Sequence, residues 1–93
     1  MNKKERAHLD KISRLGCIVC RMLGLGDTPC EIHHIRIGKG IGMRASNFNA
    51  IGLCPWHHRL GGHGEAIHAG QESWEKKFGT ESELLTKTLE DVT

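Results

Sequence analysis

The stretch Cys54-Pro-Trp-His-His58 decides most of what can be expected of this chain. Its Cys54 and His57 stand three positions apart, as do Cys17 and Cys20 earlier in the sequence. Two intervening residues let both side chains of such a pair reach one tetrahedral ion, and thiolates with a neutral imidazole suit zinc better than magnesium. We therefore predict a structural zinc ion that joins the end of an N-terminal helix to the start of a later one, held by Cys17, Cys20, Cys54 and His57.

Cys30 is the alternative fourth ligand of this zinc. We favour His57, because it forms a pair with Cys54 at ligand spacing, whereas Cys30 has no such neighbour. Cys30 would then be a small buried hydrophobic residue.

The composition of this chain favours stabilisation by a structural metal ion. It has 93 residues, with 12 Gly, two Trp, two Phe and no Tyr, so large side chains for a core are scarce. Small domains with little apolar area to bury commonly depend on a metal or on disulfides. We predict one domain over residues 1–93, with a zinc core over about residues 15–70 and C-terminal helices over about residues 71–92.

The N-terminal residues indicate a cytoplasmic protein. Lys3, Lys4, Glu5 and Arg6 precede no apolar run, which excludes a signal peptide, and no stretch is long enough to span a bilayer. Thiols stay reduced in that compartment, so paired cysteines indicate metal ligands before disulfides.

The charge is uneven along the chain. Residues 1–64 carry ten Lys and Arg and four acidic residues, a net charge of +6, whereas residues 65–93 carry three Lys and seven acidic residues, a net charge of −4. The basic part also holds the predicted metal ligands, which suits a phosphate backbone as partner. Because aromatic residues do not alternate with these charges, we expect contacts to phosphates rather than bases, from Arg36, Lys39, Arg44 and Arg59.

The pattern of apolar residues and turn formers predicts an α+β domain. We expect a helix over residues 3–15 ended by Gly16, a loop over 21–30, strands over 31–37 and 49–53 separated by a basic loop, and a short helix over 54–60. A helix over 71–78, with Trp74 and Phe78 in the core, should end at Gly79. Thr80 and Glu83 have the spacing of a capping box that opens a last helix.

A second group of residues remains after the zinc ligands are assigned. Adjacent side chains on a strand point to opposite faces, so His33 and His34 need a twist or bulge to stand side by side, or else divide the work between them. Phosphodiester hydrolysis needs a base that works near neutral pH and a hard cation. His34 as the base and a Mg²⁺ held by His33 and His58 would supply both, while Asn49 would orient the base or tie the loop to the helix.

These residues resemble the HNH (ββα-metal) endonucleases. Glu31-Ile-His-His-Ile35 is similar to the first motif of that family, Asn49 to Cys54 to the second, and Cys54 to His58 to the third. A closer resemblance is to the phage recombination-enhancement (Ref-like) RecA-dependent nucleases, over about residues 8–90. It includes Leu15 to Cys20, Pro29 to His34, Leu53 to His58, Ala66 to Gly70 and Trp74 to Gly79.

The resemblance implies a zinc-stapled ββα-metal fold with flanking helices, and DNA cleavage that depends on Mg²⁺ or Mn²⁺. By position, His34 matches the family's general base and Asn49 its Asn, whereas His33 and His58 match the catalytic metal ligands and His68 completes that shell. It also implies a phage or prophage origin, recombination as the setting and a RecA filament as a partner. Two positions depart from the common pattern: His33 stands where many HNH enzymes have Asp, and His57 where many relatives have Cys.

Two other functions compete with the nuclease. A non-catalytic zinc module that binds nucleic acid would keep the zinc ligands but could dispense with His34 and Asn49. A thiol redox protein using Cys17 and Cys20 would hold no zinc. The sequence leaves open the role of His63, the DNA substrate and the oligomeric state.

Overall fold

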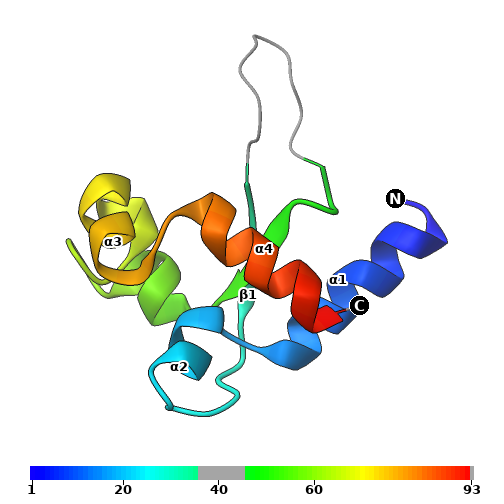
Figure 1. The fold of residues 1–93 in the computed structure, drawn as a ribbon, viewed down its shortest axis with the longest axis horizontal. Helices are drawn as coiled ribbons and strands as arrows, with labels where there is room; N and C mark the ends of the chain where they lie inside the picture. The colour runs from blue at the N-terminus through cyan, green and yellow to red at the C-terminus, as the bar shows by residue number, and fades with distance from the viewer. Residues whose placement is uncertain (36–45, 93) are drawn as a thin grey trace, which may run out of the picture.

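Two short antiparallel strands lie at the centre of the molecule and helices surround them (Figure 1). The computed structural model describes residues 1–35 and 46–92, and within these ranges it is a small α+β fold. The elements in chain order are α1 (Lys3–Leu15), α2 (Ile18–Met22), β1 (Glu31–His34), β2 (Ala50–Leu53), η1 (Trp56–Leu60), η2 (Ile67–Ala69), α3 (Gln71–Phe78) and α4 (Glu81–Val92). None of the helices in these ranges has the length and apolar character needed to cross a membrane.

Helix α1 occupies the predicted residues and has a defined cap at each end. Asn2 and Glu5 form a capping box, in which the Asn2 side chain accepts a hydrogen bond from the Glu5 backbone N–H at 2.8 Å. Gly16 ends the helix with φ of 78°, and a Cβ there would lie 2.7 Å from the Thr28 carbonyl oxygen. The chain therefore turns sharply at Gly16 and enters α2, which extends two residues into the predicted loop.

The sheet is regular over its whole described length. Glu31 pairs with Leu53 and His34 with Ala50, with one residue opposite one throughout, so β1 contains no bulge. The strand predicted over residues 31–37 ends as a strand at His34, although the Ile35 N–H still donates to the Asn49 carbonyl at 2.7 Å. Residues 36–37 lie outside the described residues.

The short helix predicted over residues 54–60 begins two residues later, as the wide turn η1. The Gly61 N–H donates to the Trp56 carbonyl, five residues back, at 2.8 Å. Pro55 precedes this turn, consistent with its lack of an N–H to donate. The wide turn matters because it carries His57 and His58.

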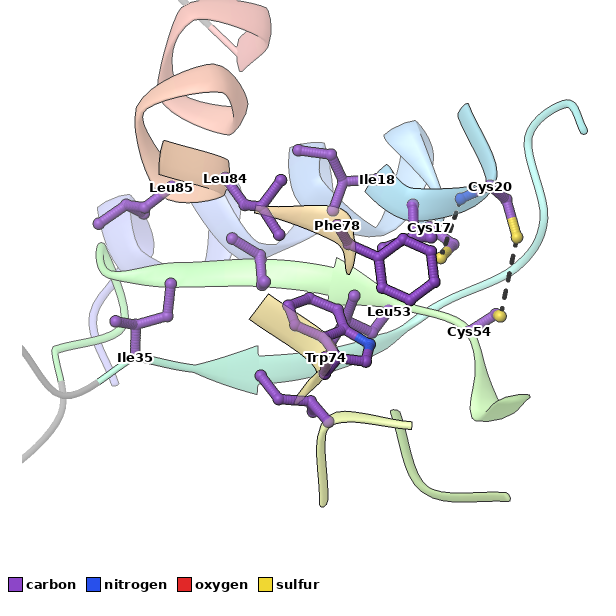
Figure 2. Packing of buried hydrophobic residues seen from close by; sticks show 13 residues of the cluster. Cys17, Ile18, Cys20, Ile35, Leu53, Cys54, Trp74, Phe78, Leu84 and Leu85 are labelled. Atoms are coloured by element: carbon purple, nitrogen blue, oxygen red, sulfur yellow. Dashed lines mark hydrogen bonds between the residues drawn. The ribbon is translucent and has the colours of Figure 1, made fainter. Parts of the chain in front are cut away.

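The core lies around β2, whose four residues are all buried. Figure 2 shows Leu53 of this strand beside Trp74 and Phe78 from α3, with Leu84 and Leu85 from α4 in the same cluster, all of them buried. Burial of these large side chains is the main apolar stabilisation available to a chain with so few aromatic residues. It also fixes α3 and α4 against the sheet.

Helix α4 begins with the predicted capping box. The Thr80 N–H donates to Glu83 Oε1 at 3.0 Å, and the Glu83 N–H donates to Thr80 Oγ at 3.1 Å. The first residue inside this helix is Glu81, whose N–H donates to Glu75 Oε2 at 2.7 Å. The cap thus places the Glu81 side chain, which takes part in the site described next.

Candidate active site and metal centres

Three thiols and one imidazole meet in a buried group, which we call the cysteine cluster: Cys17, Cys20, Cys54 and His57. The Sγ atoms of Cys20 and Cys54 lie 3.8 Å apart, and His57 Nδ1 lies 3.7, 3.6 and 3.2 Å from the sulfurs of Cys17, Cys20 and Cys54. Ligands at zinc bond lengths around a tetrahedral ion are about 3.6–3.8 Å apart. The cysteine cluster therefore fits a structural zinc ion, and the four residues are those predicted from the sequence.

The electrostatics of this cluster also favour a cation. Burial raises the pKa of the Cys17 thiol to about 12, although hydrogen bonds from the backbone of Cys54 and Cys20 oppose the rise. Burial lowers the pKa of His57, which keeps its imidazole neutral. Neutral imidazole is the form that binds metal, and a zinc ion would replace the thiol protons. Cys30 lies elsewhere, with its Sγ 3.7 Å from the Ile12 carbonyl oxygen, so the choice of His57 over Cys30 agrees with the geometry.

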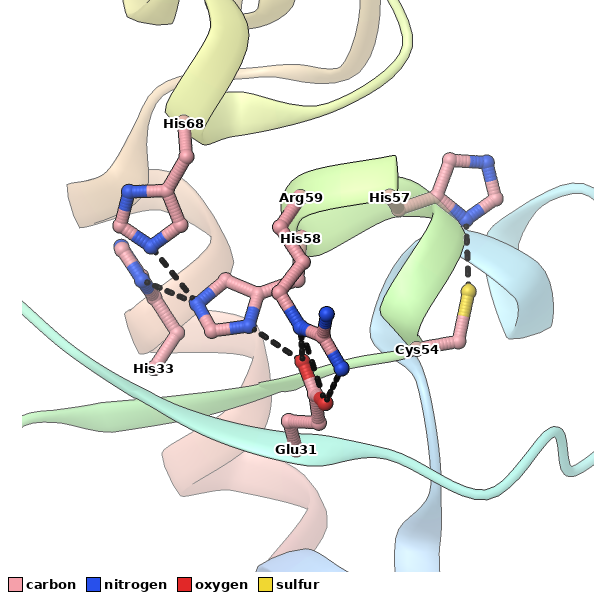
Figure 3. Close-up of polar contacts among 7 residues, drawn as sticks. All are labelled: Glu31, His33, Cys54, His57, His58, Arg59 and His68. Atoms are coloured by element: carbon pink, nitrogen blue, oxygen red, sulfur yellow. Dashed lines mark hydrogen bonds and ion pairs between the residues drawn. The ribbon is translucent and has the colours of Figure 1, made fainter. Parts of the chain in front are cut away.

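A second group consists of three imidazoles from three different elements, and we call it the histidine cluster: His33 on β1, His58 on η1 and His68 on η2 (Figure 3). His58 Nε2 lies 3.2 Å from His33 Nδ1 and 2.9 Å from His68 Nε2. Two nitrogens bound to one ion at about 2.1 Å are about 3.0–3.4 Å apart. The histidine cluster therefore fits a divalent ion as well as the cysteine cluster fits zinc.

The two clusters differ in exposure. All four residues of the cysteine cluster are buried, whereas His33 and His58 are partly buried and His68 is exposed. A closed shell of four protein ligands suits a structural ion, whereas three ligands with an open side leave room for water or substrate. His57 and His58 are neighbours in the chain, yet Figure 3 shows their rings turned in different directions, one toward each cluster.

Carboxylates hold the far ring nitrogens of two members of the histidine cluster. His33 Nε2 lies 2.6 Å from Glu81 Oε2, and His58 Nδ1 lies 2.8 Å from Glu31 Oε1. A carboxylate in this position fixes the ring and leaves the other nitrogen to bind the metal. Burial lowers the pKa of His33 while Glu81 opposes the shift, so burial favours the neutral ligand form. Neither carboxylate was assigned a role from the sequence.

Arg59 holds Glu31 in place. Its Nε and Nη2 atoms donate to the two Glu31 oxygens, at 3.1 Å and 2.8 Å to the nearer oxygen in each case. Hydrogen bonds from Arg59 and then from His58 lower the pKa of the Glu31 carboxyl to about 2, so it stays ionised. Arg59, predicted as a phosphate contact, thus has a carboxylate partner within the protein, and its contact with DNA remains a prediction.

His34 lies on the opposite face of β1 from His33, as the regular register requires. The twist that would have brought the two rings side by side does not occur. His34 is exposed, and its Nε2 lies 2.8 Å from Oδ1 of Asn47, whose amide donates to Glu5 on α1 at 2.5 Å. The Asn side chain that touches His34 is therefore Asn47, whereas Asn49 contributes its backbone carbonyl to Ile35.

The remaining predicted residues are placed as follows. His63 Nε2 lies 3.2 Å from the Ser73 hydroxyl, and its ring packs where a Cβ on Gly70 would be, so it supports the start of α3. The basic loop residues Arg36, Lys39 and Arg44 lie outside the described residues.

Residues 2–93 match the family model described as recombination enhancement, RecA-dependent nuclease. The chain belongs to this family. The resemblance stated from the sequence motifs is therefore confirmed at the level of the RecA-dependent nuclease family. A search of the curated proteins finds no match.

The histidine cluster thus lies in a chain of the RecA-dependent nuclease family. The match covers nearly the whole chain, including both candidate metal sites and the Glu5–Asn47–His34 contacts. The chain is thus a nuclease by family, with a role in recombination, and its cysteine cluster could hold a structural metal ion such as zinc.

Proposed function

We propose that this chain is a divalent-metal-dependent DNA endonuclease of the HNH (ββα-metal) type. The observation that carries the proposal is the partly open histidine cluster, built from β1, the turn that follows β2, and η2, beside a buried cysteine cluster. Family membership supports nuclease chemistry in general, and the arrangement of the histidines supports a metal-dependent form of it.

His33, His58 and His68 would hold the ion through nitrogens that face one another. When bound, the ion would supply a Lewis acid for the phosphodiester oxygens. Imidazole nitrogens suit Mn²⁺ better than Mg²⁺, which prefers a shell of oxygens. We therefore expect Mn²⁺ to support cleavage at lower concentration than Mg²⁺.

His34 is the proposed general base. It takes a proton from the water that attacks phosphorus, and the bond from phosphorus to the leaving oxygen breaks. Attacking and leaving oxygens lie roughly in line on opposite sides of the phosphorus. In this proposal the scissile phosphate lies where both the His34 ring and the histidine cluster reach it, since His33 and His34 are neighbours on β1. The roles proposed for Asn49, to orient the base or to tie the loop to the helix through its amide, remain predictions.

DNA engaged by a RecA filament is the proposed substrate, because the family description names RecA dependence. Arg36, Lys39 and Arg44 would bind the phosphate backbone, with Arg59 beside the metal site. In this proposal the protein works inside a bacterial cell, encoded by a phage or prophage.

A nicking assay tests the proposal. Zinc-loaded wild type and His34→Ala are compared on plasmid and single-stranded DNA, with Mn²⁺ or Mg²⁺ and with or without RecA filaments. We expect wild-type cleavage that depends on the ion and falls about 100-fold or more in His34→Ala, since a general base typically contributes that much. Lys87→Ala, at an exposed position on α4, is the control variant and should cleave normally.

The alternative outcomes are distinct. Full activity in a folded His34→Ala would exclude His34 as the base. Equal activity with and without RecA would show that cleavage does not require the RecA filament. Absence of wild-type cleavage in every arm would favour the non-catalytic, zinc-binding nucleic-acid module instead.

A further inference from the structure

A chain of hydrogen bonds joins helix α1 to His34, outside both metal clusters. His34 Nε2 contacts Asn47 Oδ1 at 2.8 Å, and Asn47 Nδ2 donates to Glu5 Oε2 at 2.5 Å. The three residues come from β1, from the turn before β2 and from α1. Asn47 and Glu5 have no part in the mechanism described above.

The chemistry of Glu5 determines which groups donate and which accept in these two hydrogen bonds. An ionised carboxylate only accepts hydrogen bonds. The hydrogen bond from the Asn47 side chain is the main reason that the pKa of Glu5 is lowered. The Asn47 group that faces Glu5 must therefore be its NH₂, and its carbonyl must face His34. Since a carbonyl also only accepts, His34 Nε2 must carry a proton, which in the neutral ring leaves Nδ1 as the acceptor.

Local structure fixes the positions of Glu5 and Asn47. Glu5 belongs to the capping box of α1, where its Oε1 accepts from the Asn2 N–H at 3.4 Å. The turn that carries Asn47 is held on the same helix by Phe48, whose ring centroid lies 5.2 Å from that of His8. Asn47 is therefore placed between α1 and β1 by two separate contacts with the helix.

We propose that Asn47 and Glu5 are positioning residues that hold neutral His34 in the tautomer with Nε2 protonated, so that Nδ1 accepts the proton of the attacking water. This rests on the proposed function, in which His34 is the base. The N-terminal cap of α1 thereby sets the orientation of a ring at the end of β1.

Two variants separate positioning from folding. Asn47→Ala removes the carbonyl that His34 contacts. Glu5→Gln preserves the shape of Glu5 but adds a donor, which permits the Asn47 amide to turn over and the His34 tautomer to reverse. Asp10→Asn, on the exposed side of the same helix, is the matched control.

The first readout is nuclear magnetic resonance of histidine ring nitrogens in isotope-labelled, zinc-loaded protein, without a second divalent ion and at a pH where the rings are neutral. We expect the Nε2-protonated tautomer alone for His34 in the wild type and in Asp10→Asn, and a mixture in Asn47→Ala and Glu5→Gln. The second readout is cleavage. Asn47→Ala should lower kcat about tenfold, with KM for DNA and Mn²⁺ affinity unchanged.

The inference is overturned if wild-type His34 is protonated on Nδ1 or shows mixed tautomers. It is also overturned if folded Asn47→Ala cleaves at the wild-type rate. In both cases a cleaving wild type leaves the proposed function standing. If the wild type does not cleave DNA, the proposed function fails and this inference fails with it.

Discussion

The histidines of the candidate site differ in the hydrogen-bond partner of one ring nitrogen. His58 and His33 each present one ring nitrogen to the histidine cluster and the other to a carboxylate, from Glu31 and Glu81 respectively. His34, next in the chain to His33, has an amide oxygen as partner instead. This difference in partners supports the proposal that one histidine binds the ion and the next transfers the proton.

Replacement of Glu31 tests that reasoning at the residue scale. Glu31→Gln keeps an oxygen for the His58 ring but loses the charge that pairs with Arg59. We expect the affinity of zinc-loaded protein for Mn²⁺, measured by calorimetry, to fall about 10- to 100-fold. Glu72→Gln, at an exposed position on α3, should bind Mn²⁺ as the wild type does. Equal affinities for all three proteins would remove the role given to Glu31.

At the scale of elements, two helix ends place polar partners of the strand histidines. The cap of α1 orients Glu5 toward the His34 side of the sheet, and the cap of α4 places Glu81 on the His33 side. Helix caps are local structures with a preferred sequence, so they form at defined residues. Here they also fix the direction of the side chains in the first turn.

The α4 cap can be tested by stability. Thr80→Ala removes the hydroxyl that accepts from the Glu83 N–H and should lower the free energy of unfolding by about 1 kcal/mol in denaturant titrations. Thr86→Ala, in the exposed middle of the same helix, should cost nothing, because Ala is the better helix former. A loss as large in Thr86→Ala as in Thr80→Ala would contradict this account.

The same cap predicts a dependence on pH. Hydrogen bonds from the Thr80 backbone and side chain lower the pKa of Glu83 below its ordinary value. Its contribution to stability is therefore complete above that ordinary value and is lost as the pH falls through the lower folded value. In denaturant titrations at a series of pH values, the difference in stability between wild type and Glu83→Gln should accordingly shrink on acidification through that window.

At the scale of the whole molecule, the cysteine cluster joins two distant parts of the chain at the edge of the buried core. It connects α2 to the start of η1, far apart in the sequence. A domain with so few large side chains gains much of its folding free energy from the metal when such a site is filled.

Removal of zinc should therefore unfold the domain. We expect chelation by a strong ligand to abolish cooperative thermal unfolding followed by circular dichroism, and zinc to restore it. Cys20→Ala and His57→Ala should lose the zinc, whereas Cys30→Ala should keep one zinc per chain in elemental analysis. Retention of zinc by His57→Ala together with its loss from Cys30→Ala would reverse the ligand assignment.

The sequence by itself determined the features that depend on spacing along the chain. The helix of residues 3–15 with its terminal Gly16, the Thr80 capping box and the ligand pairs of the cysteine cluster all involve residues close together in the chain or rest on local periodicity. Their hydrogen bonds and ligand distances are set by local backbone geometry, which sequence patterns describe well. His33 and His58 were also proposed as metal ligands from the sequence, and His68 was added only through the family motifs.

Only the tertiary structure decided which polar partners these residues have. Glu81 meets His33 across 48 positions, and Asn47 meets Glu5 across 42 positions. Such pairs depend on how helices pack on the sheet, which no local pattern records, so Asn49 was chosen from the motif where Asn47 makes the contact. The separation of His33 from His34 followed from strand alternation, but the packing of α1 and α4 against the sheet decided what each ring meets.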